Sequence, residues 1–471
     1  MKRVETDLCI IGGGSGGLSL AAGAVQMGAR VVLVEGHKMG GDCLNYGCVP
    51  SKALLAAGKA AQAMRMSRFG VTGAEPVVDF AAAKEHVHDV IATIEPHDSV
   101  ARFEGLGVQV IQDYGQFISE TELQAGEAVI TARRFVIATG SSPLVPPIPG
   151  IEDVQVHTNE TIFDLRDRPD HLLIIGGGPI GLEMAQAHRR LGSRVTVIEG
   201  DTALGKDDPE LAAIVLDKLR AEGIEIHEGQ MAAQIGKVGD GLFVQTKDGT
   251  RFEGSHLLMA VGRKPNIDRL NLDAAGVETT RAGVKVGPDL RSTNKRIYAI
   301  GDVAGGLQFT HVAGYHAGVV IRPILLGLPA KARTDHIPWA TYTDPELAQI
   351  GLTEAQARDA HGDKLTVARF DYAGNDRAIA IGKTTGLIKV MVVGGRPVGA
   401  SIVGDQAGEL IGIWALAIAN RLKMSAIANM VAPYPTLGEV NKRAAGAYFS
   451  PKLFDNPWVK RIVRFVQSVL P

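Results

Sequence analysis

The sequence predicts an α/β protein with two nucleotide-binding domains of the same type and a third domain after them. Three observations support this prediction. Glycine makes up 57 of the 471 residues, about 12% where roughly 7% is usual. An apolar strand, a glycine-rich turn and a helix follow one another at Gly12 and again, 164 positions later, at Gly176. From residue 336 onward, strands and helices continue without such a turn, so we expect a third domain there.

Composition excludes several classes of protein. The 49 basic and 51 acidic side chains nearly balance, whereas a nucleic-acid-binding protein usually has a basic excess, so we expect no nucleic-acid partner. Hydrophobic residues are 45% of the chain, enough for large cores. No uncharged apolar run approaches the roughly 18 residues of a membrane span. Three cysteines and the lack of a recognisable secretory signal predict a cytoplasmic location.

The first glycine motif has the order strand, helix, strand, predicted over residues 8–11, 15–28 and 30–34. Gly12, Gly14 and Gly17 allow a tight turn and let the backbone approach a pyrophosphate, which the helix N-terminus favours. Glu35 lies 18 residues after Gly17, where an acid is expected to accept a hydrogen bond from a ribose hydroxyl. One such motif alone is weak evidence, because a purely structural glycine turn gives the same pattern.

The second motif repeats the first. Gly176, Gly178 and Gly181 follow a predicted strand and open a helix, and Glu199 again lies 18 residues after the last glycine. Two full copies, each with its strand, helix and acid, make a structural coincidence improbable. A carboxylate at 199 favours the free ribose hydroxyl of NAD over the phosphate of NADP. We include Gly262, at the end of this unit, in the NAD site.

Two of the three cysteines lie five residues apart, at Cys43 and Cys48. A zinc site needs two further Cys or His ligands nearby, and the sequence offers none, so we predict no metal site. In a chain that nearly avoids cysteine, the pair indicates a reversible redox disulfide rather than two buried thiols. Cys9 differs from them, because it lies inside the first predicted strand and is expected to be an apolar core residue.

At these residues the chain resembles the flavoprotein disulfide reductases, the class I pyridine nucleotide-disulfide oxidoreductases that include dihydrolipoyl dehydrogenase, glutathione reductase and mercuric reductase. The resemblance covers nearly the whole chain. Its motifs are the Gly-Gly-x-Cys-x-Asn-x-Gly-Cys-x-Pro-Ser-Lys pattern and three shorter stretches, at residues 40–52, 136–140, 296–302 and 341–346.

The resemblance implies two Rossmann-like domains, with FAD at the first motif and NAD at the second, and a C-terminal α+β dimerisation domain that makes the protein a homodimer. Thr139, Gly140, Gly301 and Asp302 would belong to the FAD site. The FAD domain would be split by the NAD domain. The expected parts are FAD domain 1–149, NAD domain 150–266, FAD domain again 267–335, dimerisation domain 336–450 and tail 451–471.

The resemblance also implies roles for the redox residues. Cys48 would be the thiol beside the flavin, and Cys43 the interchange thiol that meets the substrate. Lys52 would lie near the flavin, paired with Glu183. The implied enzyme is an NADH-dependent FAD oxidoreductase that passes electrons to the disulfide and on to an unidentified acceptor, either a small molecule or a protein-bound group.

One position departs from the family pattern. Most of the resembled enzymes carry an active-site His, contributed by the partner subunit, where this chain has Tyr434, although Glu439 is retained. Mercuric reductase resembles this chain in having a Tyr at that place. Tyrosine has an ordinary pKa of about 10 and cannot cycle protons at neutral pH as His does. His311 and His316 are other candidate bases. Three readings therefore stay open, namely the disulfide route, direct transfer from flavin to a metal ion, quinone or oxygen, and a redox-sensing flavoprotein with little turnover.

The last residues predict an amphipathic helix with a basic face. Apolar side chains recur from Trp458 to Leu470, with Lys460, Arg461 and Arg464 between them. Such a helix packs on the dimer, which is the alternative we favour, or lies on an anionic membrane. A peripheral membrane location therefore stays open beside the cytoplasmic one.

Overall fold

The computed structural model describes residues 2–470, which form two compact units. The first unit runs to Gly177 and adds two later segments, Met184–Gly200 and Gly229–Arg333. The second unit consists of Gly178–Glu183, Asp201–Glu228 and the chain from Thr334. The five-part division expected from the sequence stays a prediction.

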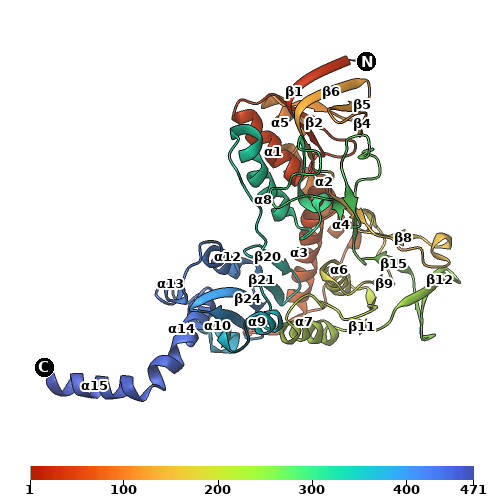
Figure 1. The fold of residues 1–471 in the computed structure, drawn as a ribbon. Coiled ribbons are helices and arrows are strands. Elements are labelled where there is room, and N and C mark those ends of the chain that lie inside the picture. The colour runs from red at the N-terminus through yellow and green to blue at the C-terminus, as the bar shows by residue number, and fades with distance from the viewer. Residues whose placement is uncertain (1, 471) are drawn as a thin grey trace. The chain divides into compact units, whose positions relative to one another are not determined.

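A seven-stranded sheet organises the N-terminal part of the first unit, with the order β3-β2-β1-β6-β5-β4 and with β19 paired to β6 (Figure 1). Its strands are β1 Lys2–Ile11, β2 Val31–Val34, β3 Gln109–Ile111, β4 Gly115–Phe117, β5 Glu122–Ala125, β6 Ala128–Ile137 and β19 Ile297–Ala299. β1 begins earlier than the apolar run at Leu8 predicts. Its first half pairs with β6, Lys2 opposite Ala128, and its exposed charged residues hide the strand pattern.

Alternate residues of β1 face opposite layers of the first unit, as the period of a strand requires. Leu8 and Ile10 pack in the same core as α1 (Ser15–Gln26) and α8 (Thr310–Ile321). Cys9 and Ile11 belong to the core on the other face. Cys9 is fully buried, which confirms it as a core residue. Further helices of this unit are α2 Gly41–Asn45, α3 Cys48–Arg65, α4 Phe80–Ile94 and α5 Val100–Gly105.

The strand–helix–strand repeat predicted at the second motif is confirmed. Its two strands are β9 His171–Ile175 and β10 Arg194–Ile198. They lie in a parallel array with the order β10-β9-β15-β8, which also contains β15 His256–Met259 and β8 Val156–His157. α6 (Pro179–Arg190) joins β9 to β10. An antiparallel three-stranded sheet accompanies them, made of β12 Ala232–Val238, β13 Gly241–Thr246 and β14 Arg251–Gly254.

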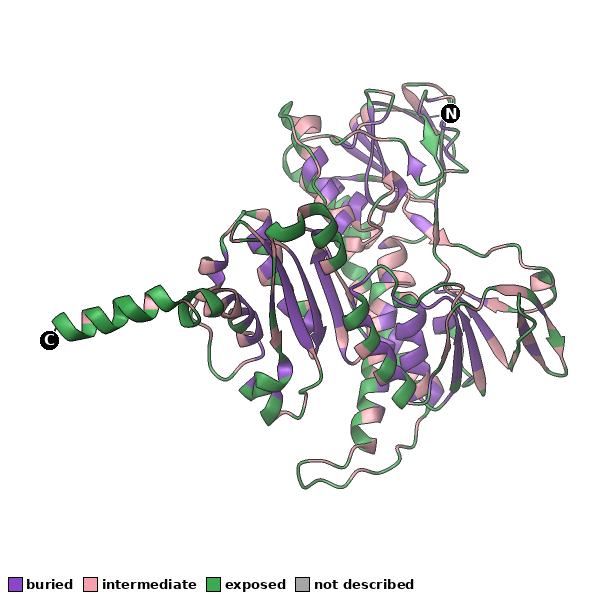
Figure 2. Ribbon diagram, turned by 60° about the horizontal axis from the view of Figure 1, so that its bottom comes forward, coloured by how far each residue is buried: buried purple, intermediate pink, exposed green. Residues whose placement is uncertain are grey.

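An antiparallel five-stranded sheet forms the core of the second unit, with the order β20-β21-β24-β23-β22. Its strands are β20 Pro338–Thr341, β21 Glu346–Gly351, β22 Leu365–Asp371, β23 Leu387–Val393 and β24 Arg396–Gly404. The three central strands, β21, β24 and β23, are largely buried (Figure 2). Trp414 is fully buried against them, and its indole N–H donates to Asn441 Oδ1 at 2.7 Å. The expected third domain is thus an α+β domain.

The second unit has long helices at α7, α14 and α15 and shorter ones between them. They are α7 Pro209–Ala221, α9 Glu354–His361, α10 Asp376–Ala380, α11 Ala407–Leu410, α12 Gly412–Ala419, α13 Met424–Ala428, α14 Glu439–Phe454 and α15 Pro457–Val469. The last of these confirms the predicted tail helix. Among residues 2–470, no helix combines the length and apolar character that crossing a membrane requires.

A buried lysine lies in the first unit without a role in the predicted chemistry. Lys84 on α4 is fully buried. Its Nζ donates to the Ile162 carbonyl at 2.8 Å and lies 3.5 Å from Nε2 of the buried His188. The rings of Phe80 and Phe163 flank the ammonium position. Burial lowers the pKa of Lys84 from 10.5 to about 7, because a charged amine is poorly solvated there.

We predict that Lys84→Met changes how stability depends on pH. In the wild type the unfolded chain takes up a proton below pH 10.5 and the folded chain only below about 7. The free energy of unfolding of the wild type therefore falls by about 1.4 kcal/mol for each unit by which the pH drops between pH 10.5 and about 7. The Met variant lacks this pH-dependent loss. It leaves the Ile162 carbonyl without its hydrogen bond, which costs about 1–3 kcal/mol of stability at every pH. It should be the less stable protein near pH 10 and the more stable one near pH 7.

Chemical denaturation of both proteins across that pH range measures the difference in unfolding free energy. Lys59→Met is the matched control, because Lys59 is exposed on α3 and its variant should show a pH-independent difference. A flat difference for Lys84→Met would mean that Lys84 stays charged in the folded protein.

Candidate active site

The first glycine motif brings backbone against backbone at the end of β1. Gly12 has φ +114°, and a Cβ there would lie 2.3 Å from the Ala138 carbonyl oxygen. A Cβ on Gly17 would lie 1.9 Å from the Gly12 oxygen. Gly14 caps α1, and its Cβ would lie in ordinary contact with Gly41. Only glycine fits at positions 12 and 17, and the N-terminus of α1 can therefore lie directly above the end of β1.

The second motif has the same geometry. Gly176 also has φ +114°, and a Cβ there would lie 2.4 Å from the Ala260 oxygen. At Gly178 and Gly262 a Cβ would meet no atom within 4 Å, so a ligand phosphate can approach the backbone closely. Gly181 lies in the first turn of α6. These features fit a bound dinucleotide at each motif.

The two predicted ribose acids occupy equivalent places. Glu35 Oε2 accepts from the amide of Gly13 at 2.5 Å. Glu199 Oε2 accepts from the amide of Gly177 at 2.6 Å. Each carboxylate is thereby fixed at the carboxyl edge of its parallel strands, beside its glycine turn. This is where the acid of a dinucleotide site contacts the ribose.

The remaining predicted FAD residues connect distant segments of the first unit. Thr139 Oγ1 donates to the Asn266 carbonyl at 2.7 Å, and the Asn266 amide N–H donates to the Gly140 carbonyl at 3.0 Å. Gly301 has φ +70° and donates its N–H to Nδ1 of the buried His316 at 3.2 Å. His316 therefore holds the backbone at Gly301, within the family-like stretch 296–302, and this contact gives His316 a structural role.

Asp302 is held by two partners that the sequence did not single out. Its Oδ2 accepts from Ser141 Oγ at 2.6 Å, and Arg263 Nε lies 3.9 Å away. Burial raises the pKa of the Asp302 carboxyl, while these two partners oppose the rise. Arg263 also binds Asp42 at 2.9 Å, next to the first redox cysteine. One arginine thus links the predicted flavin acid to the cysteine motif.

The two redox cysteines lie on consecutive helices. α2 carries Cys43, and Cys48 is the first residue of α3. Gly40 precedes α2 with φ +84°, and a Cβ there would overlap Leu44, so the motif needs its glycine. Cys48 Sγ lies 3.2 Å from Thr310 Oγ1, at the start of α8. Thr310 comes from 262 positions along the chain, and no pattern in the sequence pointed to it.

The environment separates the two thiols in acidity. A hydrogen bond from Cys43, with further help from the Thr310 hydroxyl and the Lys52 charge, lowers the pKa of Cys48 from 9.0 to about 6 against the effect of burial. The bond to Cys48 and burial raise the pKa of Cys43. The N-terminus of α3 also favours an anion at its first residue. At neutral pH, Cys48 is the thiolate and Cys43 the thiol.

The predicted Lys52–Glu183 pair stays a prediction, since the two residues fall in different units. Lys52 is half-buried on α3. Glu183 is buried on α6, where its Oε1 accepts from the amide of Tyr342 at 2.9 Å.

Tyr434 is bound to an unforeseen carboxylate. Its side chain is exposed, and its hydroxyl donates to Asp376 Oδ2 at 2.8 Å. That hydrogen bond, followed by the charge of Asp376, raises the pKa of Tyr434 above its usual 10. Glu439, half-buried at the start of α14, lies close enough to add to the rise. The phenol therefore stays protonated at neutral pH and cannot act as a base.

His311 is the other candidate base suggested by the sequence. It is exposed at the start of α8, next to Thr310, and its ring stacks on Phe309 with centroids 5.4 Å apart.

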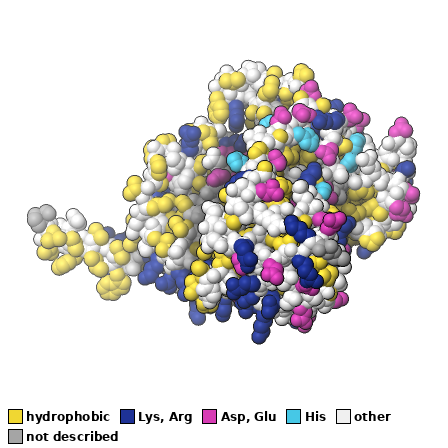
Figure 3. Space-filling view, turned by 90° about the horizontal axis from the view of Figure 1, so that it is seen from above, with side chains coloured by type: hydrophobic (Ala, Val, Ile, Leu, Met, Phe, Trp, Pro, Cys, Tyr) yellow, Lys and Arg dark blue, Asp and Glu magenta, His cyan; other side chains and the backbone are white. Residues whose placement is uncertain are grey.

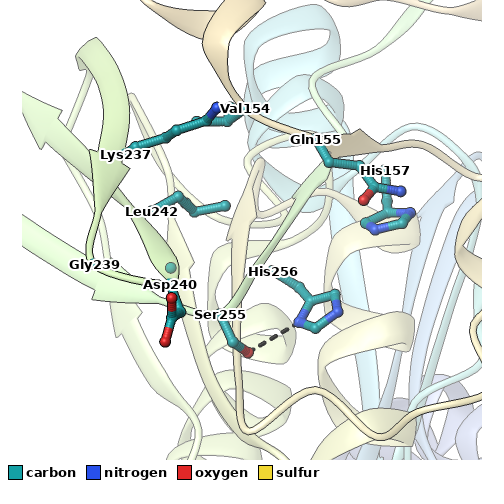
Figure 4. Close-up of a pocket in the computed structure, with 10 residues that line it drawn as sticks. Val154, Gln155, His157, Lys237, Gly239, Asp240, Leu242, Ser255 and His256 are labelled. Atoms are coloured by element: carbon teal, nitrogen blue, oxygen red, sulfur yellow. Dashed lines mark hydrogen bonds between the residues drawn. The ribbon is translucent and has the colours of Figure 1, made fainter.

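A cleft of about 310 Å³ lies elsewhere in the first unit (Figure 4). His157, Ser255 and His256 line it, with Ser255 Oγ 2.9 Å from His256 Nδ1. Ser255 and His256 lie at the amino ends of the parallel strands, whereas Gly176 and Gly262 follow the carboxyl ends. The cleft is therefore separate from the dinucleotide site.

Comparison with known proteins identifies the family. Residues 6–317 match the pyridine nucleotide-disulphide oxidoreductase family. The chain belongs to this family. Residues 337–445 match its dimerisation domain, so the enzyme is a homodimer. Members are NAD(P)H-dependent FAD disulfide oxidoreductases, and this chain shares their cofactors and their path of electrons from NAD(P)H through FAD to a cysteine pair.

Curated relatives cover most of the chain. A mercuric reductase of Streptomyces lividans is 35% identical over 457 residues, which are 94% of this chain and 96% of that protein. A mercuric reductase of Bacillus cereus is 35% identical and covers 93% of this chain and 71% of its own length. A dihydrolipoyl dehydrogenase of Bacillus subtilis is 31% identical over 92% of this chain and 96% of its own length.

Solved structures have the same fold. The Cu(II) complex of the HOCl-induced flavoprotein disulfide reductase RclA from Escherichia coli has a TM-score of 0.83 and 29% identity, covering 92% of this chain and 98% of that one. LpdA from Mycobacterium tuberculosis has a TM-score of 0.87 and 26% identity, covering 95% and 100%.

We predict that Thr310→Ala raises the pKa of Cys48 from about 6 by roughly one to two units. The thiolate loses one hydrogen bond to its charged form, which is worth about 1.5–3 kcal/mol. Because the pKa of Cys48 would be higher in the variant, its thiolate would form only at a higher pH than in the wild type. Alkylation rate of the reduced enzyme against pH measures the change. Thr310→Ser, which keeps the hydroxyl, should restore the wild-type midpoint; an unchanged midpoint in Thr310→Ala would contradict the assignment.

Proposed function

We propose that this enzyme delivers two electrons from NADH, through FAD and the Cys43–Cys48 pair, to a thiophilic metal ion. One observation carries the choice of acceptor. The residue at the place of the family's acid–base His is Tyr434, and its hydroxyl already donates to Asp376. A disulfide substrate needs a proton for its leaving thiolate, and this phenol is a poor source or store of protons. A metal ion needs none.

The relatives support the same choice. Mercuric reductases are 35% identical to the chain, and RclA has been solved as a Cu(II) complex. The dihydrolipoyl dehydrogenase relative supports the disulfide alternative. The chain has no cysteine after Cys48, so a metal ion would have to reach the pair without a C-terminal cysteine relay.

The cysteine pair supplies the chemistry at neutral pH. Bound FAD is the two-electron relay between NADH and the pair. Cys48 would lie beside the flavin as a thiolate, and Cys43 would be the thiol that meets the acceptor. When the metal ion takes two electrons, or two ions take one each, an S–S bond forms and the Cys43 proton is released. Lys52, with Glu183 as its proposed partner, would hold a positive charge near the Cys48 thiolate.

Three further assignments are part of the proposal. Glu199 selects NADH over NADPH, because its carboxylate repels a ribose phosphate. The partner's Tyr434 and the partner's Glu439 complete the site across the homodimer. The C-terminal tail makes peripheral contact with a membrane, supported by the exposure of every part of α15.

We predict that Tyr434→His raises NADH-dependent reduction of lipoamide by about tenfold or more, because an imidazole can cycle protons at neutral pH. Reduction of Hg(II) or Cu(II) should change little. Anaerobic NADH oxidation with each acceptor measures both activities. Tyr114→His is the matched control, a change of another exposed tyrosine, and should leave both rates unchanged.

Cys43→Ser decides the route in the same assay. Loss of metal-ion reduction supports the cysteine pair as the donor. Retained reduction in this variant would favour direct transfer from the flavin instead. A wild type that reduces lipoamide faster than either metal ion would overturn the proposed acceptor.

A further inference from the structure

The last helix of the chain has no covering layer within the second unit. α15 contains no buried residue, and most of its residues are exposed (Figure 2). The helix itself is well formed. Asn456 caps it by accepting the Trp458 amide N–H at 2.9 Å, and Pro457 occupies the first helical position. The cap and Pro457 fix the residue at which the helix begins.

One side of α15 is continuously apolar. At 100° per residue, the apolar side chains fall within an arc of about 160°. They are Trp458, Val459, Ile462, Val463, Phe465, Val466, Val469 and Leu470. Trp458 is 68% exposed and Phe465 is 67% exposed. The hydrophobic side chains of the tail are visible at its surface in Figure 3. An apolar strip of this width is unfavourable in water unless something covers it.

The opposite side carries positive charge alone. Lys460 and Arg461 lie toward the two edges of the apolar arc, and Arg464 lies between them on the polar side. Residues 456–470 contain no Asp or Glu. Arg461 also lies 5.1 Å from the Trp458 ring. The helix thus presents an apolar strip bordered by cations.

A second copy of the chain is a poor partner for this helix. The family's dimerisation domain ends at residue 445, well before α15 begins at Pro457. Two copies of α15 packed strip to strip in parallel about a two-fold axis would bring Lys460 of one copy toward Arg461 of the other. Anionic phospholipid satisfies both faces at once, because acyl chains take the apolar strip and headgroups take the bordering cations.

We propose that α15 binds an anionic phospholipid surface, with its axis parallel to the membrane plane and its apolar strip below the headgroups. This names the lipid chemistry of the tail contact proposed above, and it does not depend on which acceptor the enzyme uses.

Co-sedimentation of the FAD-loaded, full-length enzyme with vesicles tests the proposal. One set of vesicles contains phosphatidylcholine alone, and the other contains equal parts of phosphatidylcholine and phosphatidylglycerol. Each of the three cations should strengthen binding to an anionic surface by about fivefold. The enzyme should therefore bind the anionic vesicles on the order of 100-fold more tightly than the neutral ones. Added salt should reduce this preference, since it screens charges at a surface.

Two variants separate the faces of the helix. Phe465→Asp should weaken binding to the anionic vesicles by about tenfold or more, because an aromatic ring no longer enters the acyl region. Phe69→Asp is the matched control, since Phe69 is 66% exposed on another surface, and it should bind as the wild type does. The double change Arg461→Gln and Arg464→Gln should lower the preference for anionic vesicles by about 30-fold.

Equal binding of wild type and Phe465→Asp, or no preference for anionic vesicles, would overturn the proposal. Dissociation of the dimer by Phe465→Asp, with no vesicle binding by the wild type, would show that a second copy covers the strip. NADH oxidation without vesicles, measured on the same samples, should be unchanged in every variant. If the proposed metal-ion acceptor is wrong, the NADH oxidation assays will show it, and the vesicle sedimentation will not change.

Discussion

The negative charge on Cys48 is the feature on which this active site depends. A hydrogen bond from Cys43, the hydroxyl of Thr310 and the charge of Lys52 together outweigh burial and lower its pKa to about 6. The hydrogen bond to Cys48 and burial raise the pKa of Cys43 and keep it protonated. In the proposed mechanism, the anionic sulfur of Cys48 faces the flavin and the thiol of Cys43 meets the acceptor. This division of roles arises from position, because the two side chains are chemically identical.

The parts of the fold that backbone geometry dictates could be predicted from the sequence. Gly12 and Gly176 are required because a Cβ would overlap a carbonyl oxygen, and local strand and helix patterns on either side make each motif recognisable. Thr310 and Asp376 could not be predicted, since each reaches its partner through tertiary folding and neither belongs to a distinctive pattern. The early start of β1 was missed for a similar reason, as its pairing with β6 outweighs a charged and exposed sequence.

The position of Tyr434 connects the site to the choice of acceptor. Hydrogen bonding to Asp376 makes the phenol a weaker acid than usual, so the hydroxyl holds its proton where a family His would exchange it. In our proposal, this change disfavours the reduction of disulfide substrates and leaves the cysteine pair intact. The basic, amphipathic α15 adds a second distinction, since it lies beyond the dimerisation domain that the family shares. The proposed metal-ion acceptor and the proposed lipid contact would together place the enzyme at the periphery of a membrane.

Anaerobic titration of the FAD-loaded enzyme with NADH, followed by absorbance, tests the central claim most directly. If electrons reach the cysteine pair, a long-wavelength band from the Cys48 thiolate beside oxidised flavin should appear, weaken as pH falls through about 6, and be missing in Cys48→Ser. Simple bleaching of the flavin, identical in the wild type and in Cys48→Ser, would mean that electrons stop at FAD and that the disulfide route is wrong.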